Sequence, residues 1–243
     1  MLINASITYF TGFIILYFLL ISCSGKKENE PSPVVSDIRL LEEFTDSTLI
    51  GRQGENKIEV RKYNDGNSIY TGIVFYKKNN GNWQVQQKET FANSAIPSLD
   101  VGIADFNNDG YNDFTYVPDA AARGSNTIRS LFIYDSTANS LRYIRNSNDY
   151  PNLSYNERLN CIDSHSVYGG STTSFLKLRD DSLFCFAEVS LFDKERTIVT
   201  YSDTGEKHIL LNDTLGNEEF VHVRFSGYEP SEVLEEYNEY LNY

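Results

Sequence analysis

An oxygen-rich nonapeptide, residues 105–113 (DFNNDGYND), lies between two apolar runs of the chain. Side-chain oxygens occupy its positions 1, 3, 5 and 9, a backbone carbonyl is available at position 7, and Gly110 stands at position 6, where the chain must turn sharply. This spacing suits Ca²⁺, which takes about six to eight oxygen ligands at roughly 2.3–2.6 Å. We therefore predict a calcium loop. Its expected ligands are the side chains of Asp105, Asn107, Asp109 and Asp113 and the carbonyl of Tyr111.

The nonapeptide differs from an EF-hand loop, because Tyr116 stands at the twelfth position, where a bidentate Glu is needed. The simpler alternative is an Asn- and Asp-rich hairpin turn, since any tight turn favours Asn, Asp and Gly. Such a turn accounts for residues 108–110 but gives no reason for acidic residues at both ends of the segment. Three crowded carboxylates would repel one another without a cation, so we expect the metal to be part of the fold.

The nonapeptide resembles the D-x-[DN]-x-D-G-x-x-D loop of FG-GAP and VCBS repeats, the calcium-bearing hairpins of integrin-type β-propellers and of many bacterial surface proteins. A looser similarity runs over residues 99–191, through residues 131–134 (LFIY) and the Gly169-Gly170 segment. It is to a family of bacterial periplasmic lipoproteins with a propeller-like β fold and one such loop. Some members of that family are immunity proteins against secreted peptidoglycan hydrolases, so the resemblance implies binding of a hydrolase.

The N-terminus carries an apolar run, residues 7–21, of signal-peptide length. It ends in Leu20-Ile21-Ser22-Cys23, which resembles the lipobox of bacterial lipoproteins, where the cysteine is lipidated after cleavage. We predict a signal peptide at residues 1–22, a polar linker at residues 23–34 after lipidated Cys23, and one β-rich domain at residues 35–243. No Lys or Arg precedes the apolar run, so an uncleaved membrane anchor remains the alternative.

Either arrangement places the rest of the chain outside the cytoplasm. We expect a lipid-anchored protein of the bacterial cell envelope, at the outer membrane. The sequence does not distinguish a domain that faces the periplasm from one that faces the cell surface. The net charge of −13 argues against nucleic acid and anionic membrane surfaces as partners. It favours metal ions or a basic protein.

Period-two alternation and short runs bounded by turn residues dominate the chain, from residues 38–44 to residues 220–225. This pattern predicts an all-β fold of antiparallel hairpins and meanders in a sandwich or a β-propeller-like array. We favour the propeller-like array, which must be small or irregular because a full propeller needs more chain. A short C-terminal helix is expected at residues 230–243. Its apolar face would consist of Val233, Leu234, Tyr237, Tyr240 and Leu241.

Two cysteines remain beside Cys23, namely Cys161 and Cys185. A meander of residues 159–168, 174–178 and 183–191 would hold them on its outer strands, about 10 Å apart. A disulfide needs Cα atoms within about 7 Å, so we predict two buried thiols.

The chain contains histidines, serines and acidic residues that could act in catalysis, but they do not have the spacing of known catalytic motifs. None of His165, His208 and His222 lies in a zinc-binding motif. Residues 163–166 (DSHS) contain the types of a hydrolytic triad, but neighbours on a strand point to alternate faces. We therefore expect no enzymatic activity.

Two loops are candidates for partner binding. Tyr168 heads a loop of Gly169, Gly170 and small residues, and an aromatic beside adaptable polar groups is typical of recognition surfaces. The alternative is a hairpin loop whose tyrosine caps the sheet. Arg123 lies in a long connection, residues 120–126. It is a second candidate for contact with the partner, and the alternative is a loop charge in solvent.

These patterns together favour a calcium-stabilised, non-enzymatic envelope lipoprotein that binds a protein partner. The sharpest form is an immunity or inhibitor protein against a peptidoglycan hydrolase, since many such hydrolases are basic. A surface-exposed adhesion or glycan-binding module is the alternative, and an envelope hydrolase is a third.

Overall fold

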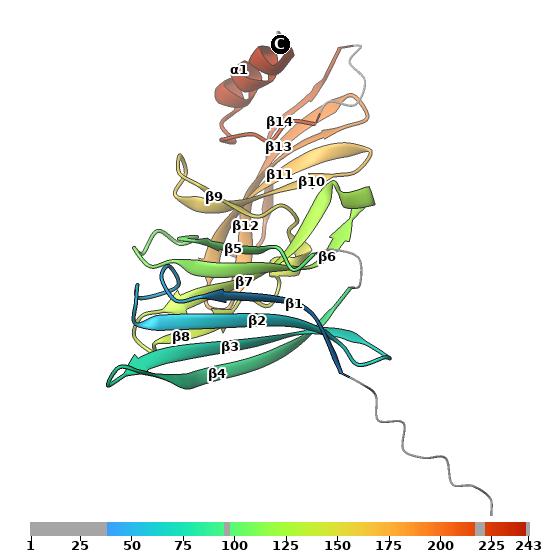
Figure 1. Ribbon diagram of the computed structural model, residues 1–243. Coiled ribbons are helices and arrows are strands. Elements are labelled where there is room, and N and C mark those ends of the chain that lie inside the picture. The colour runs from blue at the N-terminus through green and yellow to red at the C-terminus, as the bar shows by residue number, and fades with distance from the viewer. Residues whose placement is uncertain (1–37, 95–97, 217–221, 242–243) are drawn as a thin grey trace, which may run out of the picture. The chain divides into compact units, whose positions relative to one another are not determined.

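The computed structural model describes residues 38–94, 98–216 and 222–241 (Figure 1). The predicted signal peptide, the lipidation site at Cys23 and the polar linker lie outside the described residues. Three antiparallel sheets follow one another along the described chain. This confirms the predicted all-β fold, in which hairpins and meanders form an irregular propeller-like array.

The first sheet is a four-stranded meander, and its strands alternate between a buried and a partly exposed face, as β2 shows. The strands lie in the sheet in the order of the chain: β1 (Arg39–Asp46), β2 (Asn56–Asn64), β3 (Ile69–Asn79) and β4 (Asn82–Asn93).

The second sheet has the same topology, but the first six residues of β6 are all buried. Its strands are β5 (Val101–Ala104), β6 (Asp113–Ala121), β7 (Asn126–Asp135) and β8 (Ser140–Tyr143). The short 3-10 helix η1 (Ala122–Gly124) joins β6 to β7, and η2 (Ser147–Asp149) follows β8. A sheet covered on both faces has no need of alternation, which explains the continuous apolar run at residues 131–134.

The third sheet has six strands, again in chain order, and the helix α1 (Pro230–Leu241) ends the described chain. The strands are β9 (Ser154–Asn156), β10 (Cys161–Val167), β11 (Gly170–Arg179), β12 (Ser182–Phe192), β13 (Glu195–Tyr201) and β14 (Lys207–Thr214). The meander β10–β11–β12 is the predicted one, and Cys161 and Cys185 are free, as predicted. Cys161 is buried, whereas Cys185 is only half-buried.

Three apolar clusters hold the sheets together. The first joins the first and second sheets, as Val60 and Phe75 meet Phe114 and Phe132. The second joins the middle sheet to the third, through Ile133 and Leu176 among others. The third cluster covers the far face of the third sheet and includes Phe175, Val189, Phe225, Val233 and Tyr237. The middle sheet is therefore packed on both faces.

Two details of the C-terminal region correct the prediction. The described part of the expected strand at residues 220–225 is not a strand. Instead Phe225 packs into the third cluster, and its amide donates to Thr173 Oγ1 at 3.1 Å. The helix is present, but Tyr240 and Leu241 are exposed, because its packing is made by Val233 and Tyr237. The described residues include no helix long and apolar enough to cross a membrane.

Candidate functional site

Residues 105–112 form the connection between β5 and β6, and they fold around their own side-chain oxygens. The carboxylate of Asp105 accepts the amides of Asp109 at 3.2 Å and Gly110 at 2.8 Å. Asp109 accepts the amide of Tyr111 at 2.9 Å and the side-chain Nδ2 of Asn107 at 2.9 Å. Gly110 has φ of +88°, the backbone conformation for which glycine was expected at the sharp turn. The loop thus gathers the oxygens of positions 1, 3 and 5 in one turn.

Asp113, the first residue of β6, is fully buried. Its Oδ2 accepts the amide of Phe106 and its Oδ1 that of Tyr134, both at 2.8 Å. Burial raises the pKa of Asp113 to about 7, and the nearby carboxylates of Asp109 and Asp105 act in the same direction. This carboxylate therefore ties both the loop and β7 to the start of β6.

The loop also contacts segments that belong to the other two sheets. The amide of Gly51, between β1 and β2, donates to the carbonyl of Asn112 at 3.0 Å, and Asn112 Nδ2 donates to the carbonyl of Leu49 at 3.1 Å. Asn108 Nδ2 donates to Asn160 Oδ1, just before β10, at 3.3 Å. The nonapeptide is thus a junction of the three sheets.

A cavity of about 270 Å³ flanks the loop on each of two sides. Arg52, Glu55 and Tyr111 are among the residues that line one, and Asn107 and Lys177 are among those that line the other.

Calcium fits this loop in the chemistry of its donors, because carboxylate, amide and carbonyl oxygens are the ligands that it prefers. Among the described residues, no group of three or more His, Cys, Asp and Glu is placed to hold a metal ion. A site here would therefore depend on the mixed set of Asp, Asn and carbonyl oxygens. The assignment of Asp105, Asn107, Asp109, Tyr111 and Asp113 as calcium ligands stays a prediction.

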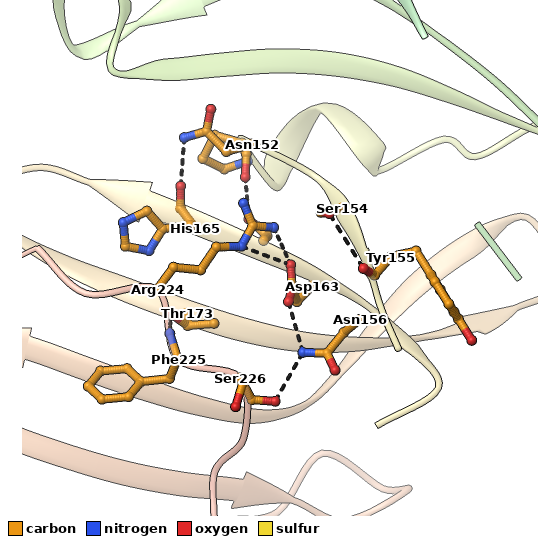
Figure 2. Close-up of polar contacts among 12 residues, drawn as sticks. Asn152, Ser154, Tyr155, Asn156, Asp163, His165, Thr173, Arg224, Phe225 and Ser226 are labelled. Atoms are coloured by element: carbon orange, nitrogen blue, oxygen red, sulfur yellow. Dashed lines mark hydrogen bonds and ion pairs between the residues drawn. The ribbon is translucent and has the colours of Figure 1, made fainter. Parts of the chain in front are cut away.

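The opposite end of β6 leads to the turn of Arg123, and hydrogen bonds join the end of this turn to the residue before Tyr168. Asn126, at the start of β7, donates from Nδ2 to the carbonyl of Val167 and accepts the amide of Val167 at Oδ1, both at 2.8 Å. Asn152 Nδ2 donates to the carbonyl of His165 at 2.8 Å (Figure 2). It also donates to the carbonyl of Ser125 at 2.9 Å. The β6–β7 and β10–β11 turns are therefore fixed beside each other.

The connection at Tyr168 is shorter than the predicted loop. Only Tyr168 and Gly169 lie between β10 and β11, and Gly170 is a buried strand residue. A Cβ on Gly170 would lie 2.1 Å from the carbonyl oxygen of Leu191, so glycine is required there by close strand packing and not by flexibility. The predicted long connection at residues 120–126 is likewise shorter, since β6 extends to Ala121.

Tyr168 pairs with a residue that the sequence did not single out. Its ring centroid lies 5.8 Å from that of Phe192, and the two side chains are 47% and 54% exposed. The Tyr168 hydroxyl is 2.7 Å from Thr172 Oγ1, which fixes the ring over the strand. Arg123 is exposed in its own turn. We call Arg123, Tyr168 and Phe192 the hairpin-tip surface.

The residues of a conceivable triad are engaged elsewhere (Figure 2). Asp163 accepts Arg224 Nε at 3.1 Å and Asn156 Nδ2 at 2.9 Å, and Ser164 Oγ donates to the carbonyl of Pro151 at 2.6 Å. His165 Nδ1 is buried without a hydrogen-bond partner among the described residues. Asp163, Ser164 and His165 thus form no relay with one another, as their alternation along the strand predicts.

Comparisons with known proteins add little to this description. No family model and no curated protein sequence matches the chain. Among solved structures, the chain is similar to one described as "Structure of a Xanthomonas Type IV Secretion System related protein", with a TM-score of 0.43 and 12% sequence identity. The match covers 70% of this chain and 93% of that chain. A similarity of this size carries no argument about function.

Proposed function

We propose that this chain is a non-enzymatic, calcium-stabilised lipoprotein of the bacterial cell envelope that binds a basic protein partner. In its sharpest form the partner is a peptidoglycan hydrolase, and the chain is its inhibitor or immunity protein. The observation that carries this proposal is the hairpin-tip surface. Exposed Arg123 and Tyr168 lie in two turns that hydrogen bonds join, and exposed Phe192, at the end of β12, contacts the Tyr168 ring.

Residue types and rigidity both support recognition at the hairpin-tip surface. Tyrosine and arginine are enriched among the residues that dominate binding energy at protein interfaces. The bonds of Asn126 to Val167 hold the two turns before any partner arrives. A surface that is ordered beforehand loses less conformational entropy on binding, so more of its contact energy appears as affinity.

The charge distribution supports a basic partner. Residues 98–243, which contain the second and third sheets, carry eleven Lys or Arg against twenty-four Asp or Glu. A surface of this sign accelerates the diffusional encounter with a cationic protein and makes the association sensitive to salt. It would repel anionic partners.

Calcium would support the fold at a distance from this contact. A bound ion would supply positive charge among three carboxylates, held by Asp105, Asn107, Asp109, Asp113 and the carbonyl of Tyr111. The nine residues of β6 separate the loop from the turn of Arg123, a span of about 26 Å. The metal would therefore order the scaffold and leave the contact to the hairpin-tip surface.

The test is inhibition of muralytic enzymes by the full-length chain in mild detergent with calcium. We expect inhibition of at least one basic hydrolase in a panel, weakened by salt and weakened at least tenfold by Tyr168→Ala. The matched control is Tyr240→Ala, which removes an exposed tyrosine from α1 and should leave inhibition unchanged. Absence of inhibition across the panel, or equal inhibition by Tyr168→Ala, would contradict the proposal, and turnover of a chromogenic ester or glycoside would indicate an enzyme instead.

A further inference from the structure

The outer face of the first sheet is rich in aromatic and cationic side chains. Strand β2 turns Ile58 and Val60 into the core, so its alternate residues lie on the opposite face of the sheet. None of the three apolar clusters of described residues includes a side chain from that opposite face. We call it the aromatic platform, and its main residues are Lys57, Arg61, Tyr63, Tyr70, Tyr76 and Trp83.

Ring contacts occur at both ends of the platform. At one end the rings of the cross-strand pair Tyr63 and Tyr70 stack, with centroids 5.3 Å apart and an interplanar angle of 26°. At the other end Lys57 Nζ lies 4.0 Å from the ring centroid of Tyr76 and 5.9 Å from that of Trp83. Tyr76 follows Tyr70 by six residues along β3, so the two ends lie about 20 Å apart along the strand. That length suits a short stretch of a linear polymer.

A gap between these ends is made by Gly72, which lies on the platform opposite Arg61. A Cβ at Gly72 would make ordinary contacts, 3.6 Å to the Tyr63 ring and 4.0 Å to the carbonyl of Arg61. Glycine is thus not required there for backbone conformation or packing. Its effect is to leave a gap in the row of side chains between the stacked tyrosines and Tyr76, next to Arg61.

The platform differs in charge from the rest of this acidic chain. Residues 38–94 carry eight Lys or Arg against seven Asp or Glu, in contrast to the strong acidic excess after residue 98. The exposed side chains Lys78 and Lys88 join Lys57 and Arg61 on this face by strand register. Two carboxylates lie among these cations: Glu59 pairs with both Lys57 and Arg61, and Glu43 pairs with Arg61, which leaves four cations against two carboxylates.

We propose that the aromatic platform binds an acidic polysaccharide, independently of protein binding at the hairpin-tip surface. Sugar rings present flat C–H faces that stack on aromatic side chains, and uronate carboxylates complement the cations. An anionic bilayer is the weaker match, because four of the aromatic side chains lie half-buried along the sheet and do not project as anchors. The platform thus recognises a flat, charged chain.

Trp83 makes the proposal testable without a label, because it is the single tryptophan of the chain and lies on the platform. The full-length protein in detergent would be titrated with a hyaluronan octasaccharide, which alternates hexosamine and glucuronate, while tryptophan fluorescence is recorded. We expect a saturable change in emission. A neutral chitin oligosaccharide of similar length should bind at least tenfold more weakly.

Two variants locate the binding. Tyr70→Ala removes one ring of the stacked pair, and Gly72→Leu places a side chain in the gap, where its Cβ makes only ordinary contacts. Each should weaken octasaccharide binding at least tenfold with an unchanged circular dichroism spectrum. Tyr168→Ala should bind the octasaccharide like wild type, and Tyr70→Ala should retain hydrolase inhibition, so either proposal can fail alone. Unchanged emission at saturating octasaccharide, binding by Gly72→Leu equal to wild type, or a response to phosphatidylglycerol vesicles without a response to the octasaccharide would overturn the inference.

Discussion

At the start of β6 the carboxylate of Asp113 is fully buried and accepts two backbone amides. Beyond the end of the same strand Arg123 is exposed, in a turn that is bonded to the turn of Tyr168. The first end turns its polar atoms inward, onto the backbone of neighbouring segments. The second end uses the side chain of Asn126 for that purpose and leaves aromatic rings in solvent. Changes at the first end should therefore affect stability, and changes at the second should affect binding.

The largest expected effect is that of Asp113→Ala. It leaves the buried amides of Phe106 and Tyr134 without an acceptor, which should lower the free energy of unfolding by about 3 kcal/mol. Denaturant titration in EDTA measures this without a contribution from calcium. Asp119→Ala, an exposed carboxylate near the other end of β6, is the control and should change stability by less than about 0.5 kcal/mol. Similar losses for the two variants would refute the contrast between the ends.

Asn126→Ala tests how the two turns are held. Loss of its paired bonds to Val167 should lower stability by about 2 kcal/mol and also weaken hydrolase inhibition, because the two turns lose their shared anchor. Tyr168→Ala should weaken inhibition while lowering stability by less than Asn126→Ala does, since Tyr168 is about half exposed. If Asn126→Ala inhibits the hydrolase as well as wild type does, the bonds that hold the two turns together are not needed for inhibition.

Calcium should act at the loop end. Extracellular calcium modules bind at about 10⁻⁴ to 10⁻³ M, and a tenfold excess over Kd adds about 1.4 kcal/mol to the free energy of unfolding by mass action. Asp109→Ala should abolish this gain, while Asn108→Gly, outside the expected ligand set and in a positive-φ position, should retain it. Identical denaturation curves in EDTA and calcium would reject the site.

The smallest expected effect is a pH dependence from His165. Burial, followed by Arg224 and His222, lowers the pKa of His165 below its usual range, against an opposing effect of Asp163. The unfolded chain then binds more protons than the folded one as pH falls from about 6.5 toward the lower folded pKa, so stability is lost across that window. In EDTA, His165→Gln should lose less stability than wild type between pH 7.5 and 5.5. His208→Gln, on the exposed part of β14, should follow wild type.

The sequence predicts what depends on local pattern. Alternation locates most strands, the Asn, Asp and Gly clusters locate their turns, and the meander excludes a bond between Cys161 and Cys185. The helical period of apolar residues identifies α1 but does not show where its buried face ends. Tyr240 fits the apolar period, yet it is exposed, whereas Val233 and Tyr237 are buried. The pattern places Gly170 in a loop, because its close contact with Leu191 is a property of the paired strand and cannot be read from the local sequence.

What the sequence misses depends on which turns become neighbours in space. Asn126 and Asn152 are ordinary loop residues in the printed chain, yet their side chains connect segments about forty and thirteen residues away. Phe192 looks like the end of a core strand, and the short strand β9 has no clear alternation. These features follow from the stacking of the sheets, which no local pattern specifies.

The order of strands in each sheet is the order of the chain, from β1 to β4, from β5 to β8, and from β9 to β14. Every strand pair is a hairpin between sequence neighbours, so loop closure costs little entropy compared with folds that pair distant strands. During synthesis from the N-terminus, each sheet can form as soon as its last strand has been made, before the strands of the next sheet exist. The junction at residues 105–113 would then be completed only when Asn160 arrives, after the first two sheets have closed and before the third.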